Sequence, residues 1–432
     1  MTSRWFHNVV AAFAVAALIG VPASSTAFAA KAMSPAEAGR AGAPEAGKLN
    51  PKKENALTAP PSQLTAAAGM DTQAKHALVL EADTGMVLLD KGSEERIPPA
   101  SMSKVMTAYL VFDYLKQGRA KLEDELPVSE NAWRTQGSKM FVPLGSRIKI
   151  DHLLRGMIVQ SGNDACIVLA EGLAGSTSAF VEQMNQKAKE IGLKDSHFAN
   201  VDGLPDPDHY MTARDLATLA LRTMQDFPEF YHYYGEKEFR FHTVAANYKE
   251  VDINQGNRNP LLYKDLGADG LKTGHTDEAG YSLLGSAKRG DRRIVVVVSG
   301  LPSMKARAQE SERLLDWAFR EFNNYQLFAK GDKVEDAEVW LGSEAKVPLT
   351  VENNLVVTIP RKARRDMKVT VSYDKPVPAP IKKGQPVGKA VVSVPDMPPA
   401  EATLVAGADV ERMGAFGRIA MAAAHLIWSR FR

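Results

Sequence analysis

Strand-like segments occur at both ends of the long central part of this chain, and the segments between them have a helical pattern. Apolar runs of strand length are found at 77–82, 86–90, 270–276, 281–287 and 293–299. Helical spacing of apolar residues is found at 101–117, 153–174, 177–192, 212–224 and 303–323. Strands from both ends with helices between them predict one antiparallel sheet flanked by helices. This is an α+β fold rather than a series of βαβ units.

Two domains are expected in this chain of 432 residues, which is long enough for two cores. The strands and helices above form a main domain over 73–325. After residue 330 the pattern changes to short alternating runs broken by proline and glycine, which predicts a small β-sandwich over 330–400. A net charge of +2 and the lack of a dense basic run argue against nucleic acid as a partner.

The first 30 residues are typical of a secretory signal peptide. Arg4 and His7 precede a short apolar run at 9–19, and Ala27-Phe28-Ala29 provides a small-residue cleavage site. The alternative is an N-terminal membrane helix, for which the apolar run is short. Residues 31–72 are rich in Ala, Pro, Gly and Lys without an apolar period, which predicts a disordered leader. We therefore expect the protein to be exported.

Cys166 is the single cysteine, so an intramolecular disulfide is impossible even in an exported protein. The fold must therefore be held by its hydrophobic cores. Because Cys166 lies within the apolar run 165–169, we expect it to be a buried packing residue.

The segment 407–432 is predicted to be an amphipathic helix. Its apolar side would carry Val410, Met413, Phe416, Ala420, Ala424, Ile427 and Phe431. The run is interrupted by Arg418 and is too short to span a bilayer. Basic residues together with Trp428 favour a helix that lies in the membrane interface. The alternative is a helix packed on the β-sandwich.

The first candidate for chemistry is Ser101-Met102-Ser103-Lys104. The chain contains four Ser-x-x-Lys sequences, but only this one lies at a predicted helix start, where residues three apart share a face. There the Ser101 oxygen would also lie beside the positive end of the helix dipole. Partial burial and a neighbouring cation would lower the pKa of Lys104, which would then accept a proton from Ser101.

Two further segments supply complementary groups. Ser161-Gly162-Asn163 lies on a turn between an apolar run and a helix, where a hydroxyl could relay a proton and an amide could hold a peptide. Lys272-Thr273-Gly274 occurs once, in a strand. Lys272 would provide positive potential for a carboxylate and for the pKa shift of Lys104, and Thr273 a hydroxyl contact. Gly274 would let a ligand approach the strand edge closely.

These three segments together form the motif set of serine β-lactamases and penicillin-binding proteins. The chain resembles the low-molecular-mass penicillin-binding proteins that are D-alanyl-D-alanine carboxypeptidases. The segments that carry the resemblance are 101–104, 161–166 and 269–277, with support from 137–140, 257–259 and 307–311. It covers about residues 73–325 and implies a catalytic domain with the penicillin-binding/β-lactamase-like transpeptidase fold. The β-sandwich and terminal helix resemble those of membrane-anchored members.

The resemblance implies a mechanism without cofactor or metal ion. Lys104 would deprotonate Ser101, which would attack the carbonyl between the last two D-alanines of a peptidoglycan stem peptide. Backbone N–H groups of Ser101 and His275 would form the oxyanion hole. Ser161 would pass the proton to the leaving D-alanine, and the remaining substrate contacts would come from Asn163, Lys272, Thr273 and Arg307. Penicillins would acylate Ser101, at the periplasmic side of the cytoplasmic membrane, to which the protein would be peripherally attached.

Three alternatives remain at this level. A class A β-lactamase needs a glutamate in a loop between the second and third motifs. The expected stretch, 197–203, contains Asp202 but no glutamate, which together with the β-sandwich favours the carboxypeptidase. A D,D-endopeptidase of the same superfamily has the same motifs. A non-catalytic scaffold that binds peptidoglycan would be marked by loss of Lys104 function.

Overall fold

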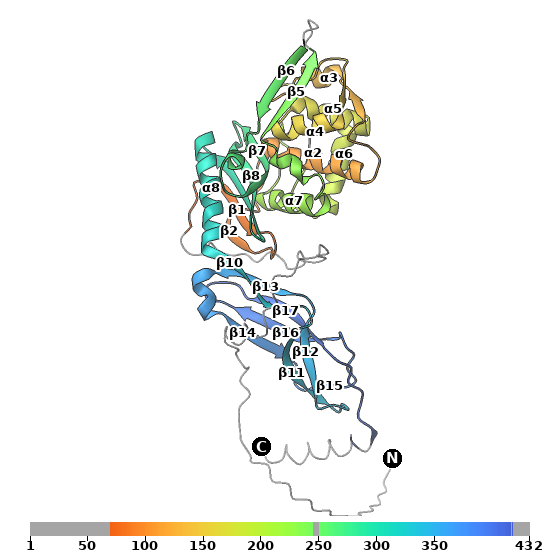
Figure 1. The fold of residues 1–432 in the computed structure, drawn as a ribbon, viewed down its shortest axis with the longest axis vertical. Coiled ribbons are helices and arrows are strands. Elements are labelled where there is room, and N and C mark those ends of the chain that lie inside the picture. The colour runs from red at the N-terminus through yellow and green to blue at the C-terminus, as the bar shows by residue number, and fades with distance from the viewer. Residues whose placement is uncertain (1–69, 245–249, 416, 418–432) are drawn as a thin grey trace, which may run out of the picture.

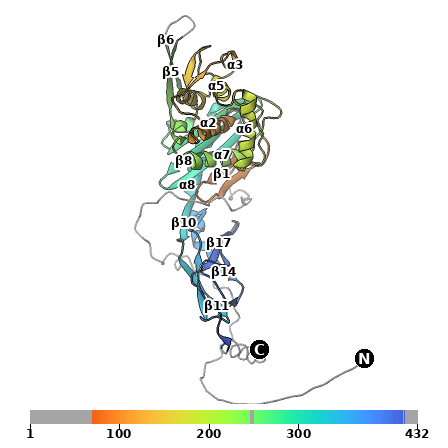
Figure 2. The same cartoon turned by 90° about the vertical axis from the view of Figure 1, so that its right-hand side faces the viewer.

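The computed structural model describes residues 70–244, 250–415 and 417, arranged as an upper and a lower domain along one axis (Figure 1). The predicted signal peptide and nearly all of the predicted leader lie outside the described residues. The side view shows the same two-part arrangement, with the strands labelled β10 and above in the lower part (Figure 2).

The upper domain is organised around one antiparallel sheet of five strands, in the order β2-β1-β9-β8-β7. The strands are β1 (His76–Glu81), β2 (Val87–Lys91), β7 (Ala268–Thr276), β8 (Gly280–Arg289) and β9 (Arg292–Leu301). The first two form the predicted hairpin, and β1 pairs with β9 from the other end of the domain. The expected fold class, an antiparallel sheet built from both sequence ends, is therefore confirmed.

Helices cover both faces of this sheet. One face packs on a cluster of helices: α2 (Lys104–Lys116), α4 (Ile150–Val159), α5 (Asn163–Ala174), α6 (Thr177–Glu190) and α7 (Ala213–Asp226). The other face packs on α8 (Met304–Glu321), whose Leu314, Leu315 and Ala318 are fully buried. Residues of β9 alternate between the two cores, Val295 and Val297 facing the helix cluster and Val296 and Val298 facing α8.

Two predicted helices differ in detail. The helix predicted over 101–117 begins as a 3₁₀ turn, η1 (Ala100–Ser103), before α2. The helix predicted over 153–174 is broken between α4 and α5, where Ser161 has a positive φ of 62°. Apolar periodicity continues through the break because the residues on both sides of it are buried, so periodicity alone does not reveal the turn.

Several short elements complete the upper domain. They are β3 (Glu125–Pro127), α3 (Glu130–Arg134), β4 (Arg147–Lys149), η2 (Tyr231–Gly235), β5 (Glu238–Val244), β6 (Glu250–Gly256) and η3 (Pro260–Tyr263). The pairs β3–β4 and β5–β6 are separate two-stranded sheets. Neither pair was predicted from the sequence.

The lower domain is all β, as predicted. Its strands are β10 (Phe322–Phe328), β11 (Lys333–Trp340), β12 (Lys346–Val351), β13 (Leu355–Pro360), β14 (Lys368–Tyr373), β15 (Val377–Pro378), β16 (Pro386–Ser393) and β17 (Ala400–Ala406), with the turn η4 (Arg361–Asp366). Six form the sheet β14-β16-β17-β12-β11-β15, while β10 pairs with β13. Their inward residues form a core of their own, separate from the two cores of the upper domain.

The prediction of a terminal helix that begins at residue 407 is wrong, because residues 407–414 are not helical. Val410 and Arg412 form bridges to Ile381 and Gly342 of the lower domain, and Val410 is 2% exposed. The residue expected on the apolar side of a helix is instead part of the β-domain core. Phe416 and residues 418–432 of that prediction lie outside the described residues. Within the described ranges, no single helix has the length and hydropathy to cross a membrane; the joined α5–α6 pair does, but it is bent by 86°.

Candidate active site

The turn η1 presents Ser101 at the start of α2. The Met102 amide donates to the Pro99 carbonyl (3.1 Å), and the buried Ser103 hydroxyl donates to the Ala100 carbonyl (2.9 Å). In a 3₁₀ turn, side chains three residues apart are eclipsed. Lys104 Nζ consequently lies 3.0 Å from Ser101 Oγ. The structure therefore brings together the first two predicted catalytic residues.

Lys104 is buried, with 1% of its surface exposed. Its Nζ donates to the backbone carbonyl of Asp202, whose loop is also tied to α2 by a hydrogen bond from Thr107 Oγ1 to the Val201 carbonyl (2.7 Å). Burial lowers the pKa of Lys104, and the positive charge of Arg258 lowers it further. A lysine with this environment is a better proton acceptor than an exposed one.

His209 supports the loop that holds Lys104, and the sequence analysis missed it. Its Nδ1 accepts hydrogen bonds from the amides of Ala199 (3.2 Å) and Asn200 (3.4 Å). Burial lowers the pKa of His209 to about 4, so the ring is neutral near pH 7. Asn200 in turn accepts from the Gly203 amide (2.7 Å). This is the same loop in which a class A β-lactamase would need a glutamate.

Ser161 lies in the break between α4 and α5. Its hydroxyl is buried and has no hydrogen-bond partner among the described residues. Burying a hydroxyl without a partner costs free energy, and so does a positive φ at a residue other than glycine. Both costs at one residue are typical of a functional position. Two residues later, Asn163 binds the preceding loop, with Nδ2 donating to the Gln136 carbonyl and its amide to the Ser138 carbonyl (both 2.7 Å).

Asp164 holds the other side of that loop. Its carboxylate accepts hydrogen bonds from the amides of Met140 (2.9 Å), Phe141 (2.8 Å) and Val142 (3.2 Å). The sequence gives no signal for this role, because the loop partner is about twenty residues away. Cys166 is buried as expected; burial raises the pKa of its thiol to about 12, so it stays protonated.

Strand β7 supplies the third group of residues. Lys272 and Thr273 are buried, with 3% and 5% of their surfaces exposed. Burial, together with the charges of Lys104 and Arg258, holds the pKa of Lys272 well below its usual range. The two lysines repel each other, so the site disfavours holding both as ammonium ions. Arg258 is a further cation that lowers the pKa of Lys104, and it was not expected from the sequence.

Arg258 is a third site residue that was not predicted from the sequence, although it lies in the segment 257–259 that supported the resemblance. Its Nη1 donates to Ser138 Oγ (2.7 Å). Its backbone carbonyl accepts from Arg307 Nη2 (3.4 Å). Arg307 is buried, its Nε has no partner among the described residues, and burial lowers its pKa to about 10. A buried guanidinium with an unused donor is suited to an anionic ligand.

The predicted reason for Gly274 needs correction. A Cβ at this position would lie 2.8 Å from the Pro99 carbonyl oxygen and 3.2 Å from Ala100 Cβ and Met102 Cγ. The glycine therefore makes room for the turn that carries Ser101, rather than only for a ligand. Beyond it, His275 is exposed and its ring lies on Tyr281, with centroids 3.9 Å apart.

Models of known protein families match both domains of the chain. The family model described as D-alanyl-D-alanine carboxypeptidase matches residues 62–303, more than half of the chain. The chain belongs to this family. A second model, the C-terminal domain of penicillin-binding protein 5, matches residues 322–412, which is the lower domain. The protein is accordingly a serine-type D-alanyl-D-alanine carboxypeptidase.

Individual carboxypeptidases agree over most of the chain. The chain is 36% identical to D-alanyl-D-alanine carboxypeptidase DacA of Haemophilus influenzae, over 79% of this chain and 86% of that one. It is 38% identical to DacC of Escherichia coli, over 79% and 85% respectively. The crystal structure of penicillin-binding protein 5 from H. influenzae aligns with a TM-score of 0.70 at 35% identity, covering 80% of this chain and all of that one. DacD from Francisella tularensis aligns with a TM-score of 0.71 at 33% identity, covering 82% and 97%.

Proposed function

We propose that this carboxypeptidase removes the terminal D-alanine from peptidoglycan stem pentapeptides through an acyl-enzyme on Ser101. The supporting observation is the 3.0 Å approach of Lys104 Nζ to Ser101 Oγ, made by a lysine whose pKa is lowered. Neutral Lys104 takes the Ser101 proton as Oγ attacks the carbonyl carbon between the two D-alanines. The carbonyl oxygen becomes an oxyanion, held by the backbone amides of Ser101 and His275.

Collapse of this intermediate breaks the peptide bond and leaves the acyl group on Ser101. The leaving amine needs a proton, which Lys104 returns through the hydroxyl of Ser161. Asn163 holds the peptide backbone of the donor strand. The carboxylate of the terminal D-alanine is bound by Lys272, Thr273 and Arg307. It accepts a hydrogen bond from the free Nε donor of the buried Arg307 guanidinium. Water then attacks the ester, the bond to Oγ breaks, and the shortened peptide leaves. Penicillins enter the same path and acylate Ser101.

A paired assay tests this proposal. The protein without residues 1–30 is incubated with a pentapeptide ending in D-Ala-D-Ala and, separately, with a labelled penicillin, beside a Ser101→Ala variant. We expect release of D-alanine and stable labelling, both lost in the variant. Labelling without release would indicate an endopeptidase or a substrate-binding scaffold instead. No labelling would mean that Ser101 is not the acylated residue.

We also propose that the protein is exported and attached to the outer surface of the cytoplasmic membrane. The support is sequence-based: the signal-peptide pattern of residues 1–30 and the apolar positions within 416–431. Replacing Phe416, Ile427 and Phe431 with serine should move the protein from the membrane to the soluble fraction. Membrane retention of that triple variant would contradict the attachment.

A further inference from the structure

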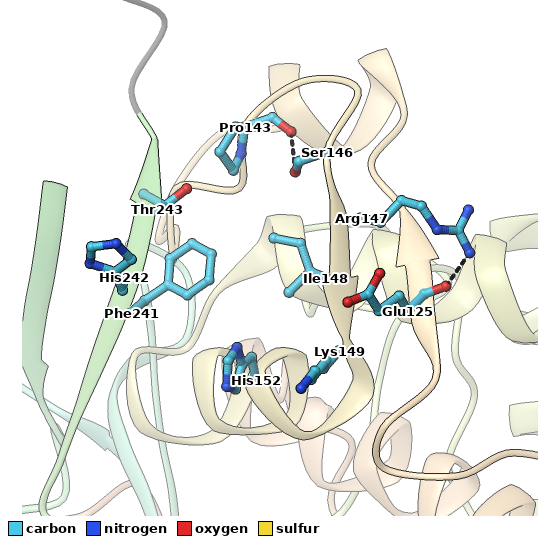
Figure 3. Close-up of a pocket in the computed structure, with 10 residues that line it drawn as sticks. All are labelled: Glu125, Pro143, Ser146, Arg147, Ile148, Lys149, His152, Phe241, His242 and Thr243. Atoms are coloured by element: carbon cyan, nitrogen blue, oxygen red, sulfur yellow. Dashed lines mark hydrogen bonds between the residues drawn. The ribbon is translucent and has the colours of Figure 1, made fainter. Parts of the chain in front are cut away.

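A cavity that Ser101 does not line lies in the catalytic domain. It has a volume of about 340 Å³ and lies between the start of α4, the adjoining strand β4 and strand β5 of the β5–β6 hairpin (Figure 3). None of the residues assigned to the active site lines it. Its volume is within the range of small-molecule sites. The mechanism proposed above does not use it.

The lining of the cavity combines an apolar base with unused polar groups. Ile148 and Phe241, 5% and 3% exposed, point toward its centre. Glu125, Lys149 and His152 surround them. Within the described part of the chain, neither the Glu125 carboxylate nor the Lys149 ammonium has a hydrogen bond or ion pair, and the His152 imidazole has no hydrogen bond. By contrast, the Arg147 guanidinium is turned away and donates to the Glu125 backbone carbonyl.

These features define the chemistry of a ligand. The exposed Glu125 and Lys149 side chains carry opposite charges, so the rim of the cavity has no excess charge to attract a ligand of one sign. An apolar base bordered by separate donors and acceptors suits a neutral ring that has an apolar face and hydroxyl or amide groups at its edge. We propose that this cavity binds a sugar of the peptidoglycan glycan strand. The proposal rests on the proposed function, because it places the sugar on the same polymer as the cleaved stem peptide.

The position of the cavity fits that polymer. In the hairpin, Phe241 faces Ile253, and Arg258 of the active site follows five residues later. At about 3.3 Å per extended residue, Arg258 lies within roughly 17 Å of Ile253, the partner of the cavity residue Phe241. An extended stem of five residues also spans about 17 Å. The loop between α3 and β4 links the two places directly, because Gln136 binds Asn163 while Pro143 lines the cavity.

The test compares two substrates that differ only in the sugar. The double variant Glu125→Ala/Lys149→Ala is assayed on a free pentapeptide and on the same pentapeptide attached to its disaccharide. We expect kcat/KM on the disaccharide substrate to fall about tenfold, mainly through KM, because two hydrogen-bonding groups are lost. Activity on the free peptide should be retained. The matched control is Glu182→Ala/Lys189→Ala on α6, whose residues are equally exposed and lie outside the cavity.

A direct binding measurement separates this proposal from the proposed function. Calorimetry with the Ser101→Ala protein and glycan strands lacking stem peptides should show binding that the added double substitution weakens. Equal losses on both substrates would mean that the cavity holds peptide, and would overturn the sugar site. Unchanged kinetics and unchanged glycan binding would overturn it as well. Glycan binding by a protein that releases no D-alanine would instead contradict the proposed carboxypeptidase reaction.

Discussion

At the scale of single residues, the active site depends on three basic side chains rather than on one lysine: Lys104 and Lys272 are buried, and Arg258 is exposed. Burial lowers the pKa of both Lys104 and Lys272, and Arg258 lowers both further. The positive charge of Arg258, which lowers both pKa values, also attracts a carboxylate, so it favours both the neutral base and the substrate's terminus. The serine is activated only when Lys104 is neutral, and its lowered pKa brings that state closer to physiological pH.

Arg258→Gln should move the acid limb of the pH profile for acylation to higher pH. Removing the cation lets the pKa of Lys104 rise, so a higher pH is needed to reach the neutral base, and the acid limb moves with it. The rate of labelling by a fluorescent penicillin from pH 6 to 10 measures it. Arg96→Gln, which removes an exposed arginine paired with Asp195, should leave the profile unchanged. A lower plateau with the same acid limb would assign Arg258 only to its contact with Ser138.

Sequence patterns reveal residues that the chemistry requires, but not those that position them. Ser101, Lys104 and Lys272 occur in short motifs and were predicted. Arg258, His209 and Asp164 act through loops that meet only in the folded chain, so their spacing has no pattern to detect. The predicted strands of the main sheet were found because buried strands have long apolar runs. The β5–β6 hairpin was missed, since β6 is polar and exposed or half-buried, and the only buried pair in β5, Phe239 and Phe241, makes a short alternation.

At the scale of elements, the start of α5 and the loop before β4 form one unit. The Asp164 carboxylate binds three consecutive loop amides, and Asn163 binds the loop twice. Asp215 makes a similar arrangement far from the nucleophile, accepting from the amides of Lys194 (3.0 Å) and Asp195 (2.8 Å). Asp164 and Asp215 both hold a loop by accepting hydrogen bonds from its backbone, but Asp215 is far from the nucleophile. Substituting each in turn therefore separates an effect on stability from an effect on activity.

Asp164→Asn should lower both stability and acylation. An asparagine has one acceptor oxygen, and its NH₂ group would face backbone N–H donors, at a cost of about 1–3 kcal/mol. The released loop would no longer hold Asn163 and Ser138 in place, so labelling by penicillin should slow by at least tenfold. Asp215→Asn should lower the melting temperature similarly while labelling stays near the wild-type rate. Equal labelling rates in the two variants would contradict a positioning role for Asp164.

At the scale of the whole molecule, the two domains are joined by polar contacts as well as by chain continuity. Glu81 of β1 is fully buried and pairs with Arg292 of β9, with Oε2 2.7 Å from Nη2. Arg292 also donates to the Phe322 carbonyl at the start of β10 (2.7 Å), and Thr84 and Thr358 hydrogen bond across the junction. Arg292 therefore ties the edge of the catalytic domain to the first strand of the lower domain.

Arg292→Gln should destabilise the protein, and more strongly at high pH. Removing one partner leaves the Glu81 carboxylate buried without its counter-charge, which costs about 3–5 kcal/mol. Burial already raises the pKa of Glu81 above 4.5, despite Arg292, and loss of the arginine raises it further. The folded variant thus binds a proton at pH values where the unfolded chain does not, and this contribution to stability is lost as pH rises through the raised pKa. The melting temperature measured at pH 5 and pH 8 should therefore show the larger deficit at pH 8. The control is Arg320→Gln, which removes an exposed ion pair with Glu321 and should change the melting temperature little at either pH. If Arg292→Gln instead lowers the melting temperature equally at pH 5 and pH 8, Glu81 does not titrate in the folded protein.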